Sequence, residues 1–143
     1  MKFFAALAIL FTATVWMTGA DTPAGVVYAD HDKVAVALAK GGPLATTPGF
    51  VVMGNHRNGP AGSEMHEGHS HVFYVTDGTA TIVLGGTIVD SKTTEPGEIR
   101  GSKIDGGTEQ KLSKGDVIVI PPGTPHWWKE TSSFSYFVVN VNK

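Results

Sequence analysis

GDVIVIPPGTPHWWKE, from Gly115 to Glu130, joins a run of β-branched residues to a Pro-Pro-Gly break and then to a histidine. A short apolar run that ends at proline and glycine is typical of a strand followed by a turn. His126, Trp128 and Glu130 then share one face of a second strand, because side chains alternate across a strand. The stretch therefore predicts two strands, with a histidine at the start of the second.

Similar β-branched runs recur between glycine-rich breaks from Phe50 onward. They are FVVMG, HVFYVT, TATIVL, TIVD, DVIVI, HWWKE and FSYFVVNV, with Asp77-Gly78 and Gly85-Gly86 at the joints. This spacing predicts an all-β sandwich or barrel over residues 50–143. The polar, glycine-rich residues 91–110 are expected to form a long loop or an extra hairpin inserted between two halves of the barrel.

Residues 21–49 precede the barrel and include the stretch ADHDKVAVALAKGG. Asp30 or Asp32 can begin a helix there, and Gly41 can end it. The alternating apolar pattern of residues 34–38 also fits a strand. The alanines and the terminal glycine favour the helix, so we expect an N-terminal lead with one short helix.

Residues 1–20 have the order of a signal peptide. Lys2 is followed by the apolar run FFAALAILFTATVW and by TGA, whose small residues suit cleavage before Asp21. The alternative is an uncleaved membrane anchor, since the apolar segment is just long enough to span a bilayer. We expect cleavage and a periplasmic or secreted protein.

The composition of the chain without residues 1–20 argues against a nucleic-acid partner and excludes sites built from cysteine. Without residues 1–20 it carries 10 basic and 13 acidic residues and no basic cluster, which argues against a nucleic-acid partner. Cysteine is absent, so disulfides and thiolate metal sites are excluded. We also expect no membrane partner after cleavage.

A second stretch, EMHEGHSHVFYVTDG, contains three of the six histidines in the chain. Glu64 and His66 share one strand face, and His71 opens the next strand. Together with His126 they can point into a common interior, where imidazoles and a carboxylate suit a divalent first-row metal. The alternative is a set of hydrogen-bonded polar residues that line a small-molecule pocket.

GDVIVIPPGTPH resembles the second motif of the cupin superfamily, a glycine, five residues, Pro-x-Gly, two residues and a histidine. The first cupin motif, His-x-His, three or four residues, Glu, six residues and Gly, matches in spacing when counted back from Gly78. Two residue types are exchanged, because Glu64 stands where the first histidine belongs and His71 where the glutamate belongs. The resemblance covers roughly residues 50–141.

The resemblance implies a jelly-roll barrel with one divalent transition metal, Mn, Fe, Zn, Ni or Cu, held by Glu64, His66, His71 and His126. It also implies a small organic ligand or substrate, with dioxygenase, isomerase or lyase chemistry. A non-catalytic binding or sensing module, with or without metal, is the alternative. A second copy of the chain, in a homodimer, is another partner that we consider.

Several other residues are candidates for the site. A register based on His69-x-His71 would need a glutamate at position 75 or 76, where the chain has valine and threonine, so His69 is not expected to be a ligand. Glu130 would face inward and suit proton transfer as a catalytic residue, or else lie at the barrel rim.

Phe73 and Trp128 would wall the pocket or belong to the core. The chain has two arginines, Arg57 and Arg100, and either could bind a substrate carboxylate. Nothing in the sequence brings them to the site.

Overall fold

The computed structural model describes residues 23–143. The predicted signal peptide, residues 1–20, lies outside the described residues. Within residues 23–143, no helix has both the length and the hydrophobicity required to cross a bilayer.

The expected N-terminal helix is present as α1, His31–Lys40. Asp30 caps its start, where the side chain accepts a hydrogen bond of 2.8 Å from the backbone N–H of Lys33. Gly41 ends the helix at a φ of 78°, a conformation that glycine adopts without strain. The helix packs through Ala37 on a glycine of the sheet, Gly54, because a Cβ there would lie 2.8 Å from the Ala37 backbone.

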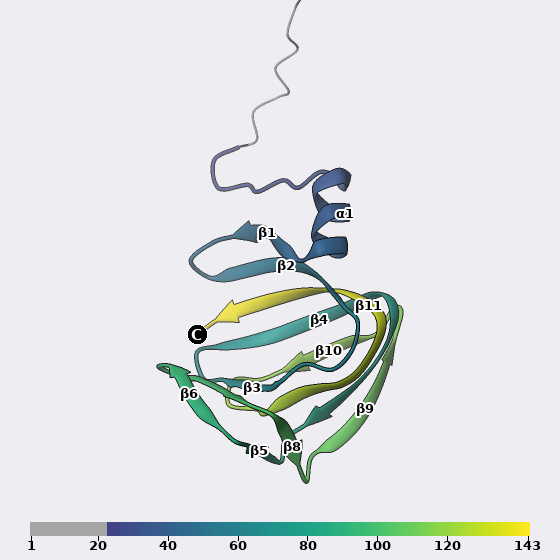
Figure 1. Ribbon diagram of the computed structural model, residues 1–143. Coiled ribbons are helices and arrows are strands. Elements are labelled where there is room, and N and C mark those ends of the chain that lie inside the picture. The colour runs from purple at the N-terminus through teal and green to yellow at the C-terminus, as the bar shows by residue number, and fades with distance from the viewer. Residues whose placement is uncertain (1–22) are drawn as a thin grey trace, which may run out of the picture.

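The rest of the described chain is antiparallel β-structure (Figure 1). The strands are β1 (Gly42–Thr46), β2 (Phe50–Arg57), β3 (Ser63–His66), β4 (His69–Leu84), β5 (Thr87–Val89), β6 (Lys92–Glu95), β7 (Glu98–Gly101), β8 (Lys103–Asp105), β9 (Thr108–Ser113), β10 (Val117–Ile120) and β11 (His126–Asn142). One sheet runs β1-β2-β11-β3-β7-β6, and β4 pairs with β9, β10 and β11. β5 and β8 form a separate pair. The sheet begins at Gly42, inside the segment expected to be the lead.

The long strands β4 and β11 curve together and give the molecule its two layers (Figure 1). The sequence predicted a joint between strands at Asp77-Gly78, which is wrong, because β4 continues through both residues. The pairing is irregular here, with register shifts between Ser132 and Ser135 on β11. Gly78 has a φ of 75°, and a Cβ on it would lie 2.3 Å from the Ser133 carbonyl oxygen. The turn residues therefore mark a bulge that bends the strand rather than ending it.

The core lies between the two layers. Aromatic rings dominate it, and Trp128, Phe134 and Tyr136 are each no more than 2% exposed. Phe73 packs edge-on against Trp128, with ring centroids 5.3 Å apart, and lies 5.1 Å from the ring of His71. Trp128 and Phe73 are therefore both core residues, and Phe73 is the one whose ring lies next to that of His71.

Residues 91–110 form the extra hairpin rather than a long loop. β6 and β7 pair with each other, and β7 also pairs with β3. In that register Arg100 lies opposite Glu64 and Glu98 lies opposite His66. The hairpin thereby brings two charged residues to the strand that carries half of the predicted metal ligands.

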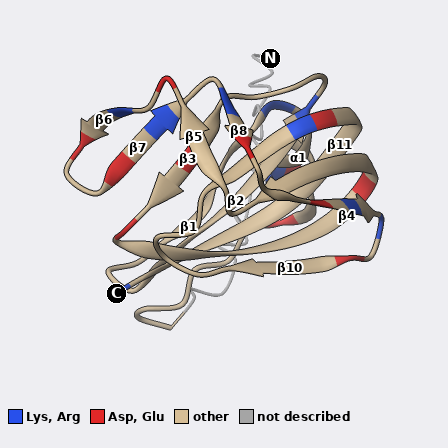
Figure 2. Ribbon diagram, turned by 90° about the horizontal axis from the view of Figure 1, so that it is seen from below, with Lys and Arg blue, Asp and Glu red and all other residues tan. Residues whose placement is uncertain are grey.

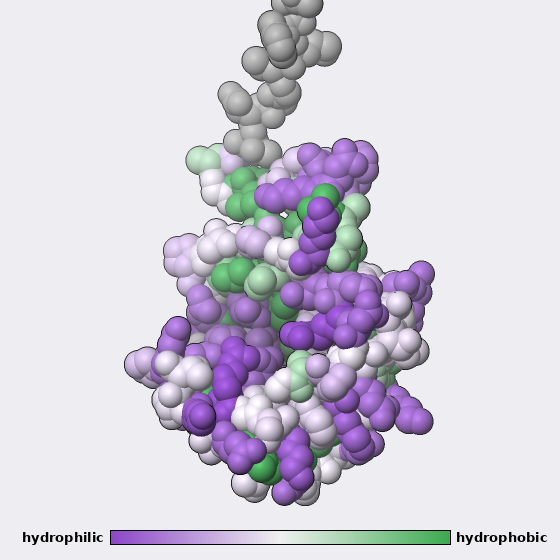
Figure 3. Space-filling model, viewed as in Figure 1, coloured by the Kyte–Doolittle hydropathy of each residue, from purple (hydrophilic) through white to green (hydrophobic). Residues whose placement is uncertain are grey.

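Charged residues of both signs are interspersed over the strands and α1, without a basic patch among the described residues (Figure 2). In the view of Figure 3, most of the hydrophobic surface lies in the upper half, around α1 and the neighbouring strands. Exposed apolar side chains also lie on β10, where Val117 and Val119 are 61% and 58% exposed.

Candidate metal centre

The structure brings the four predicted ligands together. Glu64 and His66 come from β3, His71 from β4 and His126 from the first residue of β11. Their ligand atoms all lie within 4.8 Å of one another. The pairing of Glu64 opposite His126 accounts for the arrangement, because it aligns the ends of two strands that are far apart in sequence.

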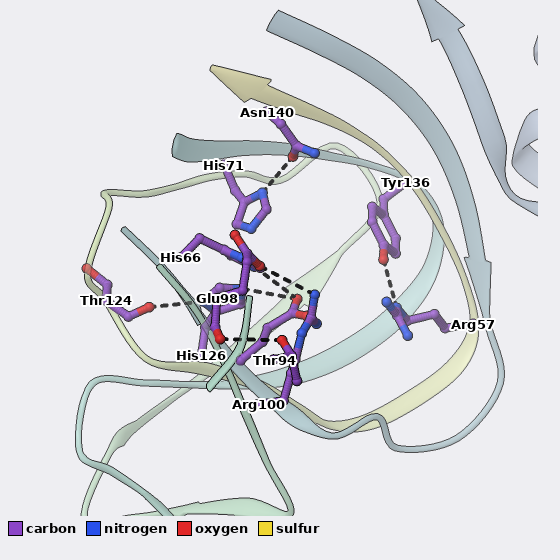
Figure 4. Close-up of polar contacts among 11 residues, drawn as sticks. Arg57, His66, His71, Thr94, Glu98, Arg100, Thr124, His126, Tyr136 and Asn140 are labelled. Carbon is purple, nitrogen blue, oxygen red and sulfur yellow. Dashed lines mark hydrogen bonds and ion pairs between the residues drawn. The ribbon is translucent and has the colours of Figure 1, made fainter. Parts of the chain in front are cut away.

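The Nδ1 atom of each of the three imidazoles contacts an oxygen atom of another residue (Figure 4). His71 Nδ1 lies 2.7 Å from the Asn140 Oδ1 atom, and His66 Nδ1 lies 2.5 Å from the Glu98 carboxylate. His126 Nδ1 donates to the Thr124 carbonyl oxygen at 3.0 Å. Because all three partners are oxygen acceptors, Nδ1 carries the proton in each ring. The lone pair is therefore on Nε2.

The three Nε2 atoms face one another, and two of them lack a hydrogen-bond partner in the part of the chain that the structure describes. His66 Nε2 and His71 Nε2 are buried and have no hydrogen bond within the described residues. His126 Nε2 lies 3.2 Å from one carboxylate oxygen of Glu64. Buried polar atoms without partners are rare in proteins, and they indicate a missing group such as an ion.

Glu64 is oriented by a residue from the extra hairpin. Its Oε1 atom faces His126 and lies 3.9 Å from His66 Nε2, while its Oε2 atom pairs with the guanidinium group of Arg100. The second nitrogen of that guanidinium lies 3.7 Å from the Glu98 carboxylate. One oxygen of Glu64 is thus left for the histidine cluster.

Burial keeps the histidines in the form that binds metal. It lowers the pKa of His71 to about 3, with a further contribution from the nearby His126. Burial likewise lowers the pKa of His126 to about 4, partly offset by its hydrogen bond to Thr124. Both rings are neutral at physiological pH, as a metal ligand must be.

These residues fit a divalent transition metal. Three neutral imidazole nitrogens and one carboxylate oxygen are a donor set that such ions accept. Nδ1–H bonds to oxygen acceptors are the usual arrangement behind metal-binding histidines, because they fix the ring and its tautomer.

His69 lies beside this cluster. Its ring stacks on that of His66 with centroids 4.4 Å apart. His66, His69 and Glu98 form a second group whose ligand atoms lie within 4.8 Å of one another. Glu98, however, already accepts the hydrogen bond of His66 Nδ1. Burial, followed by the charge of His66, lowers the pKa of His69. The exclusion of His69 from the ligand set remains a prediction.

Glu130 does not reach the cluster, and its predicted inward orientation is wrong. The register between β4 and β11 shifts between Trp128 and Glu130, so the carboxylate is exposed. It lies 3.4 Å from the Thr81 hydroxyl, on a surface groove of about 490 Å³ that it shares with Lys111. Four residues of strand also separate it from His126, a distance of roughly 13 Å. The structure gives no support to a catalytic role.

Three residues of the site were not predicted from the sequence. Asn140 lies on the inward face of β11 two residues after Val138, and a polar residue on that apolar face was a usable signal. Glu98 and the contact of Arg100 with Glu64 depend on the pairing of β7 with β3, for which the sequence offers no local signal.

The comparisons with known proteins agree on the fold. The family model described as cupin matches residues 18–143. No curated protein is similar enough to this chain to count as a match.

Similar solved structures include protein NMB1881 from Neisseria meningitidis, with 14% identity and a TM-score of 0.53 over 76% of this chain and 96% of that chain. The hydroquinone 1,2-dioxygenase from Sphingomonas sp. TTNP3 with 4-hydroxybenzoate bound has 16% identity and a TM-score of 0.54, over 77% of this chain and 72% of that one. Hydroquinone 1,2-dioxygenase PnpCD in complex with Cd2+ and 4-hydroxybenzonitrile has 17% identity and a TM-score of 0.52, over 71% of this chain and 62% of that one.

At these identities the structural likeness concerns the fold alone. The family model, in contrast, matches nearly the whole chain, and this match shows common ancestry with the family. The chain therefore belongs to the cupin family and has the all-β jelly-roll fold expected of it.

Proposed function

We propose that the protein binds one divalent transition metal through Glu64, His66, His71 and His126, and acts with it on a small organic molecule. One observation carries this proposal. The Nε2 atoms of His66 and His71 are buried without partners, while every Nδ1 atom of the three histidines is held by an oxygen acceptor. A polar pocket, the alternative from the sequence, would use these Nε2 atoms to bond an organic ligand, but three of them converging with a carboxylate suit an ion better.

Once bound, the metal would polarise a substrate oxygen or activate a bound ligand as a Lewis acid. The chain itself holds the imidazoles in place through Glu98, Asn140 and Thr124, and holds Glu64 through Arg100. The side chain of Arg100, on the extra hairpin, is 48% exposed, whereas the three histidines are buried.

The class of reaction is the finer part of the proposal. The two dioxygenases above are in complex with 4-hydroxybenzoate and with 4-hydroxybenzonitrile, which supports a small organic molecule as the partner here. Dioxygenase, isomerase or lyase chemistry fits a site of this composition. The role in proton transfer that the sequence assigned to Glu130 would then belong to His69, whose imidazole lies beside the cluster.

A non-catalytic binding or sensing module is the second candidate. The exposure of Glu130 favours it, because the proton-transfer residue expected from the sequence is absent from the cluster. Turnover of small metal-chelating substrates by the metal-loaded protein would support the enzyme. Binding without turnover would support the sensor.

Export and self-association complete the proposal. We place the mature protein, starting near Asp21, in the periplasm or outside the cell. The mass of the expressed protein tests this placement, and recovery of only the full-length chain in membranes would contradict it. A homodimer would cover the exposed apolar residues Val117 and Val119 of β10.

Metal content of the purified protein tests the metal centre itself. Elemental analysis should find close to one transition metal per chain, and His71→Ala should lose it. His56→Ala is the matched control, because His56 bonds Ser135 and Asn58 outside the cluster. Free metal at 100 times its dissociation constant stabilises the fold by about 2.7 kcal/mol, so for a domain of this size a chelator should lower the Tm by roughly 8–16 °C. An unchanged Tm together with no stoichiometric metal would contradict the proposal.

A further inference from the structure

The two arginines of the chain, Arg57 in β2 and Arg100 in β7, are 43 positions apart in the sequence. Arg100 contacts Glu64 directly. Figure 4 shows Arg57 and Arg100 in the same region as the histidines.

Arg57 points into the interior of the fold. Alternation along β2 places it on the same face as Met53, which packs on the core. Its Nε atom donates a hydrogen bond of 2.7 Å to the hydroxyl of Tyr136, a residue that is 2% exposed. Tyr136 packs on Phe73, which in turn packs on His71. The guanidinium is therefore fixed near the cluster by a buried aromatic residue.

The two arginines differ in their partners. Arg100 is occupied by Glu64 and faces Glu98 at 3.7 Å. Arg57 has no carboxylate partner within the described residues, and its hydrogen bond to Tyr136 uses only Nε. The two terminal nitrogens of Arg57 remain, and their planar edge matches the two oxygens of a carboxylate.

The charges of the site also favour an anion. The two guanidinium groups balance the carboxylates of Glu64 and Glu98, so the positive charge of a bound divalent ion would remain uncompensated. A partly buried arginine and an uncompensated cation both gain from a negatively charged ligand.

We propose that Arg57, oriented by Tyr136, binds the carboxylate of a small organic ligand at the metal centre, and that this site selects small carboxylates over neutral analogues. Arg100 has the separate task of orienting Glu64 toward the metal. This proposal rests on the proposed function for the role of the ion, but the arginine contact can be measured with and without metal.

Calorimetric titration with benzoate and with the neutral benzamide tests the selection. Zinc-loaded protein should bind benzoate at least tenfold more tightly than benzamide. Arg57→Gln should remove most of this preference, while its zinc content stays at that of the wild type. Lys111→Gln is the charge-matched control, because Lys111 is exposed on the groove near Glu130 and should leave both affinities unchanged.

Two further variants keep the test decisive. Tyr136→Phe retains the ring and removes the hydroxyl that holds Arg57, so it should weaken benzoate binding less than Arg57→Gln does. Arg100→Gln should lower zinc affinity, which Arg57→Gln should not. If Arg57→Gln does not fold, Tyr136→Phe with full benzoate affinity would overturn the proposal.

The results distinguish failure of this proposal from failure of the proposed function. Equal benzoate affinity in wild type and Arg57→Gln, or no benzoate binding by zinc-loaded wild type, would overturn the carboxylate site while leaving the metal centre intact. If the protein binds no zinc, the proposed function fails. The comparison of wild type with Arg57→Gln in metal-free protein then decides the carboxylate site on its own.

Discussion

The two ends of the segment from His126 to Glu130 differ in their surroundings although they lie four residues apart on β11. His126 is 1% exposed, its Nδ1 donates to Thr124, and its Nε2 lies 3.2 Å from a carboxylate oxygen of Glu64. Glu130 is exposed, and the Thr81 hydroxyl approaches it only to 3.4 Å. The shift in pairing between Trp128 and Glu130 separates them. Strand alternation thus identifies a site residue only as far as the strand remains regular.

Replacing these two residues should give the largest contrast. His126→Ala opens a buried cavity and removes the hydrogen bond to Thr124, so we expect a loss of about 2–4 kcal/mol in the free energy of unfolding. Glu130→Ala removes an exposed group, and we expect a change within ~0.5 kcal/mol. Urea denaturation of the two variants, after a chelator has removed any metal, measures both changes in the free energy of unfolding. Equal losses would mean that Glu130 is part of the same buried network.

The residues behind the histidines should have an intermediate effect. Glu98→Gln keeps the size of the side chain but removes the charge that His66 Nδ1 faces, so metal affinity should fall about 10-fold or more. Glu95→Gln is the control, because Glu95 lies exposed on the same hairpin. Competition with a coloured chelator gives both affinities. Equal affinities for the two variants would remove Glu98 from the site.

The pH dependence of the metal-free protein should show the smallest effect. As the pH falls below ~6.5, the ordinary histidine value, the unfolded chain takes up protons. Folded His71 and His126 do not until the pH nears their pKa values of about 3 and about 4. The unfolded state therefore binds more protons in this window, and stability falls as the pH falls, by on the order of 1 kcal/mol between pH 7.5 and 6.

Urea midpoints in that range measure the trend, and His126→Ala should flatten part of it. A stability that rises on acidification would mean that the histidines are charged in the folded state. The lowered pKa values also move acid release of the metal below the pH of about 6 that an unperturbed histidine would give.

Much of the fold and the centre of the site could be predicted from local patterns. The glycine and proline breaks predicted the β-class, and the spacing of the two motifs placed Glu64, His66, His71 and His126 in one interior. The helix from His31 was confirmed because its capping aspartate and terminal glycine are local signals.

Tertiary pairing decided what the sequence did not predict. Glu98 reaches His66 only because β7 pairs with β3, and Arg57 reaches the hydroxyl of Tyr136 only because β2 pairs with β11. Asp77-Gly78 has the composition of a turn, but long-range pairing with β11 kept β4 continuous. These contacts join segments that no local pattern connects.

A crystal of zinc-loaded protein, examined by anomalous scattering at the zinc edge, tests the central claim most directly. We predict one ion, about 2.0–2.2 Å from the Nε2 atoms of His66, His71 and His126 and from one oxygen of Glu64. The Nδ1 contacts to Glu98, Asn140 and Thr124 should remain as they are. An ion held instead by His69 and Glu98, or no ion at all between the three Nε2 atoms, would contradict the account.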